Sequence, residues 1–159
     1  MVEEGQGVTG AGAPEETSGL ARLRAALARP SGRPGLGATL GFRLVAADPG
    51  RVVFEGEPTV DHTNPLGSVH GGYAAALLDS AMGCALQTRL DEGRGYGTVE
   101  LQVAYHRPLS PGRGRVRAEG WIVTLGARLA FAEATLVDAR GRLCATGRSS
   151  LLLRASGAP

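Results

Sequence analysis

Six segments of the chain alternate between apolar and polar residues. Alternation with a period of two is typical of β-strands that bury one face. The first two segments, at 38–47 and 51–58, are joined by the turn sequence Asp48-Pro49-Gly50, which favours a hairpin. The remaining four follow one another with Gly or Pro turns between them, at 97–107, 114–124, 128–138 and 143–153. We therefore expect six antiparallel strands in two groups.

Between the two groups lies a stretch, from Tyr73 to Leu90, that favours a helix. It is rich in Ala and Leu, and its larger apolar residues recur every four positions, at Leu78, Met82 and Leu86. An apolar stripe of this kind predicts a helix buried in the core.

This buried helix contains one charged side chain, Asp79, the only one between His70 and Arg89. A lone carboxylate in an apolar setting carries a large desolvation penalty unless a polar group meets it. A neighbouring helix or Ser80 would satisfy it for purely structural reasons. A reacting substrate would satisfy it for functional ones, and we favour the functional interpretation.

A shorter helix is predicted at 18–28, where Leu20, Leu23 and Leu27 form a stripe, Ser18 is a candidate N-cap and Pro30 is a stop. The element order is then two strands, the long helix and four strands, without the alternation of a parallel sheet. This order predicts an α+β fold in which an antiparallel sheet wraps around one long central helix. We divide the chain into a flexible tail at 1–17 and a single domain at 18–159.

The start of the long helix favours the binding of an oxyanion. If the helix begins at Gly71, its first backbone N–H groups lack partners within the helix and carry the positive end of the helix dipole. Gly71 and Gly72 have no Cβ, so a ligand can approach the backbone closely. Steric reasons alone could select one glycine, but a doublet weakens a helix start. We therefore favour the Gly71 N–H as an oxyanion donor.

The spacing of His70 and Asp79 indicates a second chain. Nine residues, at about 100° and 1.5 Å each, place the two on roughly opposite sides of the helix and about 13 Å apart. Two antiparallel copies of the helix, packed side by side, would bring the N-terminus of one against Asp79 of the other. We therefore expect a homodimer with two composite active sites.

The same positions carry a resemblance to a known family. The chain resembles the hotdog-fold acyl-CoA thioesterases of the phenylacetate-degradation (PaaI) type at 61–72 (DHTNPLGSVHGG), 78–83 (LDSAMG), 98–103 (TVELQV) and Arg107-Pro108. The resemblance extends, in order, over roughly residues 36 to 154. It implies a hotdog fold and hydrolysis of an acyl-CoA, with aryl-acetyl or benzoyl groups expected at the family level, to the free acid and CoA. It also implies dimers that pair into tetramers.

The resemblance assigns roles to individual residues. It makes Asp79 the catalytic carboxylate, acting as nucleophile on the thioester carbonyl or as general base for water. It makes Asn64 the residue that orients the attacking group, although Asn before Pro most often closes a turn. It places the hydroxyl of Thr98 near the carboxylate, a position that a β-branched strand residue would suit equally well. It puts His70 in the site, where we expect it to fix the loop by hydrogen bonds rather than to titrate.

The amino-acid composition excludes several classes of reaction and suggests residues for binding CoA. All 17 basic residues are Arg, which excludes a Schiff-base lysine and a phosphate-loop lysine. Arginine matches the geometry of phosphate, so Arg107, Arg128 and Arg148 are candidates for binding the phosphates of CoA. Cys84 and Cys144 are too few and too separated for a metal site or a disulfide framework, and we expect two buried thiols. We expect no metal and no other cofactor, since CoA is part of the substrate.

Other partners are disfavoured. Aromatic residues make up 4% of the chain and do not interleave with a basic patch, so we expect no nucleic acid. The longest apolar run, 71–86, is shorter than a membrane span and contains Asp79, so we expect no membrane insertion. Residues 1–12 carry acidic residues and glycines where a signal peptide needs basic and apolar ones. We therefore expect a cytoplasmic protein.

Two other functions fit the same fold. A non-catalytic acyl-CoA-binding module would use the same pocket to sense its ligand. A hotdog enoyl-CoA hydratase would add water to an enoyl group with His70 and Asp79, although the spacing from Asn64 to Gly72 resembles the thioesterases more closely. Free thiol as a product would identify hydrolysis, and loss of enoyl absorbance without thiol would identify hydration.

Overall fold

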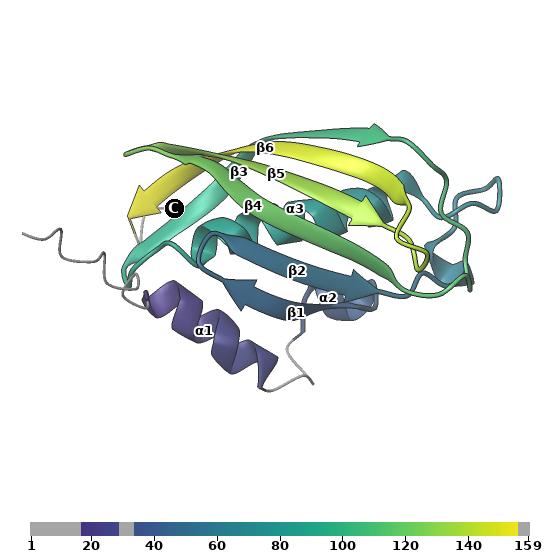
Figure 1. Cartoon of the computed structure of the whole chain (residues 1–159), viewed down its shortest axis with the longest axis horizontal. Coiled ribbons are helices and arrows are strands. Elements are labelled where there is room, and N and C mark those ends of the chain that lie inside the picture. Colours follow the sequence, from purple (N-terminus) through teal and green to yellow (C-terminus); the bar gives the residue numbers. More distant parts are fainter. Residues whose placement is uncertain (1–16, 29–33, 156–159) are drawn as a thin grey trace, which may run out of the picture.

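A six-stranded antiparallel sheet wraps around one long helix (Figure 1). The structure, a computed structural model, describes residues 17–28 and 34–155. The strands are β1 (Phe42–Asp48), β2 (Arg51–Gly56), β3 (Arg94–Tyr105), β4 (Val116–Leu125), β5 (Leu129–Val137) and β6 (Leu143–Ala155). The helices are α1 (Ser18–Leu27), α2 (Leu36–Thr39) and the central α3 (Gly71–Gln87), and Val60–His62 forms a 3-10 turn. The spatial order is β1-β2-β4-β5-β6-β3, so β1 and β3 are the edges.

The predicted α+β architecture and element order are confirmed, but the first strand begins later than expected. The segment predicted as a strand at 38–47 becomes extended only at Phe42, because Leu36–Thr39 forms the helix α2. Thr39 N donates to the Gly35 carbonyl oxygen at 3.1 Å, which closes this single turn. Gly41 then reverses the chain with a φ of 65°, a conformation that favours glycine. The alternation of Leu and Ala near residue 38 was therefore not a strand signal.

The central helix also ends earlier than predicted. It stops at Gln87 rather than Leu90, because Thr88 takes over the hydrogen bonding at its end. The Thr88 hydroxyl donates to the Ala85 carbonyl oxygen and accepts from Gly50 N, both at 2.6 Å. The end of α3 is thereby tied to the hairpin that joins β1 and β2.

The N-terminal helix is capped one residue before the predicted Ser18. The hydroxyl oxygen of Thr17 accepts a hydrogen bond from Leu20 N at 3.2 Å and donates one to the Thr88 carbonyl oxygen at 2.7 Å. The flexible tail predicted at 1–17 lies outside the described residues except for Thr17, and the stop predicted at Pro30 also lies outside them.

Close packing between α3 and the inner face of the sheet forms the core. The predicted stripe of Leu78, Met82 and Leu86 is fully buried. The sheet presents small side chains to the helix, namely Ala118, Ala130, Ala132, Ala134 and Ala145. The two backbones approach closely at Gly120 of β4, where a Cβ would lie only 2.5 Å from the Ala81 carbonyl carbon. The helix backbone therefore touches the sheet backbone at this point.

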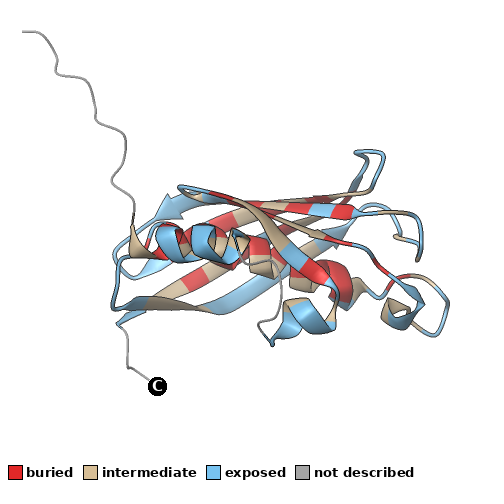
Figure 2. Cartoon of the chain, turned by 90° about the horizontal axis from the view of Figure 1, so that it is seen from below, coloured by how far each residue is buried: buried red, intermediate tan, exposed pale blue. Residues whose placement is uncertain are grey.

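The two edges of the sheet differ in their cover. On the β1 side, α1 packs Leu20 against Ala47, Val52 and Ala85, and its outer surface is exposed (Figure 2). The edge strand β3 pairs with β6 alone among the described strands. Apolar side chains of β3 are exposed, at Val99 (61%), Leu101 (37%) and Tyr105 (56%). A long bare edge with apolar side chains is a surface that natural proteins normally pair or cover.

Among the described residues, no helix combines the length and the apolarity that crossing a membrane requires.

The close approach at Gly120 predicts a sharp stability effect. Gly120→Ala should lower the free energy of unfolding by about 1–3 kcal/mol, because the added Cβ overlaps the backbone of Ala81 and the helix must shift. The measurement is the midpoint of chemical denaturation. Gly95→Ala in β3 is the matched control, since no atom lies within 4 Å of its added Cβ. Equal midpoints for the two variants would contradict the packing described here.

Candidate active site

His70 caps the N-terminus of α3 and leaves one backbone donor free. Its Nδ1 atom accepts a hydrogen bond from Gly72 N at 2.9 Å, and its carbonyl oxygen accepts one from Tyr73 N at 3.0 Å. His70 thus makes hydrogen bonds of the kind expected from the sequence, and its part in catalysis stays a prediction. Within residues 17–28 and 34–155, the Gly71 N–H meets no acceptor. A free N–H at the first helical position is suited to an anionic oxygen.

Tyr105, at the end of β3, holds the same turn from the other side. Its hydroxyl donates to the Gly71 carbonyl oxygen at 2.9 Å. A Cβ at Gly71 would lie 3.0 Å from that hydroxyl oxygen, so a larger residue would displace Tyr105. Sequence reasoning did not identify Tyr105. Its alternation with Leu101 and Val103, which pair across from Ser149 and Gly147, is the pattern that would have placed it on the inner face.

A cavity of about 290 Å³ opens beside Gly71. Its volume is close to the lower end of the range for small-molecule sites. Its apolar walls are formed by Val69, Ala74, Leu109, Leu136 and Ala145. The helix N-terminus therefore faces a hollow that is mostly apolar.

Asp79 lies further along α3, away from the helix N-terminus, and has a polar partner on the sheet. Its Oδ1 atom accepts a hydrogen bond from the Thr98 hydroxyl on β3 at 3.1 Å. The hydroxyl of Thr98 therefore lies where the sequence placed it, next to the carboxylate. Asp79 is half-buried in the single chain. Its contact with β3 puts it beside the bare edge of the sheet.

The charge of Asp79 affects two neighbouring groups. Burial and, to a smaller extent, this charge raise the pKa of the Cys84 thiol to about 11. Burial, Cys84 and Asp79 together raise the pKa of the Tyr96 phenol above its ordinary value. Tyr96 packs onto α3 at Gly83, where a Cβ would lie 2.5 Å from its hydroxyl oxygen. Both groups therefore keep their protons at neutral pH.

Both cysteines are free thiols. Cys144 is buried, as predicted, and burial is the main cause that raises its pKa, whereas Cys84 is only half-buried. A protonated thiol is a poor nucleophile. In the part of the chain that the structure describes, no three His, Cys, Asp or Glu side chains are grouped so that they could hold a metal ion.

One chain does not bring Gly71 and Asp79 together. They are eight residues apart on one helix, which corresponds to about 12 Å along its axis. Asp79 does not line the cavity beside Gly71. A single reacting group therefore cannot contact both within one chain.

Asn64 closes a turn in the loop before α3. Its Oδ1 atom accepts hydrogen bonds from Leu66 N at 2.9 Å and Ser68 N at 3.3 Å, and its backbone N donates to the Ser68 carbonyl oxygen at 2.8 Å. This is the structural use that the sequence left open as an alternative. No hydrogen bond joins Asn64 to Asp79 within residues 34–155. The orienting role of Asn64 stays a prediction.

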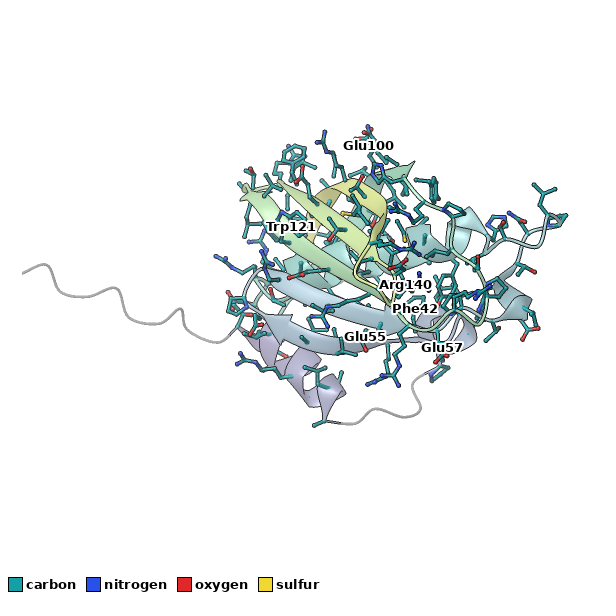
Figure 3. The ribbon with its side chains drawn as sticks, turned by 45° about the vertical axis from the view of Figure 1, so that its right-hand side comes forward. Phe42, Glu55, Glu57, Glu100, Trp121 and Arg140 are labelled. Atoms are coloured by element: carbon teal, nitrogen blue, oxygen red, sulfur yellow. The ribbon has the colours of Figure 1, made fainter. Side chains whose placement is uncertain are left out.

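The three arginines proposed for phosphate binding lie in different places. Arg107 lines the cavity beside Gly71, and its Nη1 atom donates to the Leu143 carbonyl oxygen at 2.9 Å. Arg128 lies in the turn between β4 and β5. Arg148 pairs with Glu133 at 3.3 Å and lines a surface hollow together with Glu100. Figure 3 labels Glu100. Neither Arg128 nor Arg148 lines the cavity, and their contact with CoA stays a prediction.

Comparison with known proteins gives consistent results. Residues 66–145 match the family model described as the thioesterase superfamily. Human acyl-coenzyme A thioesterase 13 is 34% identical over 106 residues, which cover 66% of this chain and 74% of that protein. A variant structure of the phenylacetic acid degradation protein PaaI from Thermus thermophilus is 32% identical, with a TM-score of 0.67 over 73% of this chain and 96% of that one. A thioesterase family protein from Silicibacter pomeroyi is 28% identical, with a TM-score of 0.76 over 87% of this chain and 100% of that one.

The coupling between Asp79 and Cys84 is directly measurable. A nearby negative charge disfavours the thiolate, so Asp79→Asn should lower the pKa of Cys84 from about 11. The measurement is the pH dependence of alkylation in a Cys144→Ala background, which leaves one thiol. Asp91→Asn, an exposed carboxylate in the loop after α3, is the control and should leave the profile unchanged. A Cys84 pKa that stays the same or rises in Asp79→Asn would contradict the arrangement.

Proposed function

The chain belongs to the thioesterase superfamily, whose members are thioester hydrolases, and on this premise we propose that it hydrolyses an acyl-CoA to the free acid and CoA. The observation that carries the proposal is the unpaired Gly71 N–H at the head of a mostly apolar cavity. A thioester carbonyl placed there would accept this hydrogen bond. The bond strengthens as the carbonyl oxygen becomes an oxyanion.

In the proposed reaction, Asp79 supplies the attack on the carbonyl carbon. It acts either as the nucleophile or as the base that takes a proton from the attacking water. As nucleophile, it forms an anhydride with the acyl group while the C–S bond breaks and CoA leaves, and water then hydrolyses the anhydride to the free acid and Asp79. The hydrogen bond from Thr98 holds one carboxylate oxygen and leaves the other for the reaction. Single turnover in oxygen-18-labelled water tests for the first route: label in Asp79 identifies an anhydride that water cleaves at the Asp79 carbonyl, because base catalysis places label only in the acid.

The proposed site is completed by a second copy of the chain. Gly71 and Asp79 are too far apart on one helix to share a substrate carbonyl, and Asp79 adjoins the bare β3 edge. Pairing of two β3 edges would continue the sheet and set the two α3 helices side by side. The Gly71 donor of one protomer would then face Asp79 of its partner. The exposed apolar side chains of β3, Val99 and Leu101, support this interface.

Several finer assignments stay predictions. The proposed reaction requires no metal or redox cofactor, because the carboxylate and the backbone donor supply its chemistry. Asn64 is proposed to orient the attacking group through its amide nitrogen, since its Oδ1 atom is held by the loop. The pairing of dimers into tetramers and the cytoplasmic location remain predictions from the sequence.

Loss of the carboxylate should abolish hydrolysis. Asp79→Asn should reduce thiol release from acyl-CoA by at least about 10²-fold, because Asn can neither attack nor take a proton. The measurement uses a chromogenic thiol reagent with a panel of phenylacetyl-, benzoyl- and straight-chain acyl-CoAs, which also ranks the acyl groups. Asp91→Asn is the control, and the dimer should persist in both variants.

Other results of this assay would reject the proposal. Near-normal thiol release by Asp79→Asn would exclude the catalytic role of the carboxylate. Binding of acyl-CoA without thiol release by the wild type would identify a binding module. Loss of enoyl absorbance without thiol would identify a hydratase.

A composite site predicts complementation between two inactive variants. Gly71→Pro removes the proposed N–H donor at the first helical position and displaces Tyr105 of the same chain, and Asp79→Asn removes the carboxylate. Refolding an equal mixture should yield about half heterodimers, each with one intact site and one doubly altered site. Thiol release should recover to about one quarter of the wild-type rate. No recovery, with heterodimers demonstrated by mass spectrometry, would mean that the site lies within one chain.

A further inference from the structure

A second hollow adjoins the cavity beside Gly71. Its volume is about 260 Å³, and it shares Pro108 and Leu109 with that cavity. Its character is different, because it is lined by three arginines and a single aspartate. We call it the arginine cleft, and its charged residues are Arg113, Asp138, Arg140 and Arg142.

Only one of the three arginines is neutralised. Arg142 binds Asp138 with two donors, its Nη2 atom at 2.7 Å and its Nε atom at 2.8 Å from Oδ2. These hydrogen bonds lower the pKa of Asp138 to about 2, so the ion pair persists at neutral pH. The guanidinium groups of Arg113 and Arg140 form no ion pair with any of the described residues. The cleft therefore keeps an excess of positive charge.

The two unpaired arginines lie on turns that are held in place. The Oδ1 atom of Asp138 accepts hydrogen bonds from the backbone N of Arg140 at 2.9 Å and of Arg142 at 3.0 Å, which fixes the turn between β5 and β6. Figure 3 labels Arg140 on this turn. On the other side, Gly112 N donates to the Pro58 carbonyl oxygen at 3.0 Å and fixes the loop that carries Arg113. The backbone positions of both side chains are thus determined before any ligand binds.

We propose that the arginine cleft binds the phosphates of the CoA nucleotide, while the cavity beside Gly71 holds the uncharged pantetheine arm. This inference rests on the proposed function. CoA joins an uncharged arm, which carries the thioester, to a strongly anionic nucleotide. The two adjoining hollows show the same division, with mostly apolar walls next to the Gly71 donor and unpaired guanidinium groups beyond Leu109. One guanidinium group can donate two parallel hydrogen bonds to two oxygens of the same phosphate.

The location also distinguishes these arginines from the three chosen on sequence grounds. Arg107 lies in the cavity wall, but one of its donors is used by the Leu143 carbonyl oxygen. Arg148 is paired with Glu133. Arg113 and Arg140 are far apart in the sequence. They line the same cleft because the loops that carry them lie at the same end of the sheet.

The test compares two thioesters that differ only in the nucleotide. The double variant Arg113→Gln/Arg140→Gln should raise the KM for an acyl-CoA about tenfold or more and leave kcat unchanged. Its KM for the same acyl group on pantetheine, which lacks the nucleotide, should equal that of the wild type. Arg51→Gln, which removes a surface arginine paired with Glu119 between β2 and β4, is the matched control and should change neither value. The denaturation midpoint establishes that the variants are folded.

A binding measurement makes the test independent of turnover. Calorimetry with 3′,5′-ADP should show binding to the wild type and at least about tenfold weaker binding to the double variant. An unchanged KM for acyl-CoA together with unchanged binding of 3′,5′-ADP would overturn the inference. Equal losses for acyl-CoA and the pantetheine thioester would also overturn it. Absence of hydrolysis of both thioesters by the wild type would reject the proposed function alone, since binding of 3′,5′-ADP would still decide the role of the cleft.

Discussion

The close packing of α3 against the sheet determines where each part of the site can lie. Alanines on the sheet and the bare backbone at Gly120 let the helix touch the strands, and both of its ends are tied, at His70 and at Thr88. Gly71 and Asp79 both lie on this helix, so the helix geometry itself keeps them about 12 Å apart within one chain. In the proposed dimer, the relative position of donor and carboxylate therefore depends on how two rigid chains pair, and each chain contributes half of each site.

Most of the architecture was predictable from the sequence because its strands alternate and its helix has an apolar stripe. The failure near residue 38 shows the limit: Ala38 and Thr39 were predicted to begin a strand, but hydrogen bonds from Thr39 N and Leu40 N close Leu36–Thr39 into a helical turn. Candidate site residues were recognisable where they are close in sequence, as in the loop before α3, and their roles stay predictions. Tyr105 and the arginine cleft were missed because the register of β3, β5 and β6 brings them into place.

The arginines show why composition alone could not assign binding residues. This chain has no lysine, so all of its 17 basic residues are arginines. They differ in whether the guanidinium group is held in an ion pair. Arg51 binds Glu119, Arg142 binds Asp138 and Arg148 binds Glu133, so these three stabilise the surface of the sheet and its turns. Availability for an anionic ligand depends on which guanidinium groups the folded chain leaves unpaired next to the cavity, and that is a property of the fold.

The cap at the start of α3 has a consequence for the protonation of its imidazole. Because Nδ1 of His70 accepts the Gly72 N–H, the neutral ring must carry its proton on Nε2. The other neutral tautomer, with the proton on Nδ1, would set a donor against a donor and remove the cap. The order of the Gly71 turn is therefore linked to the tautomer of one histidine.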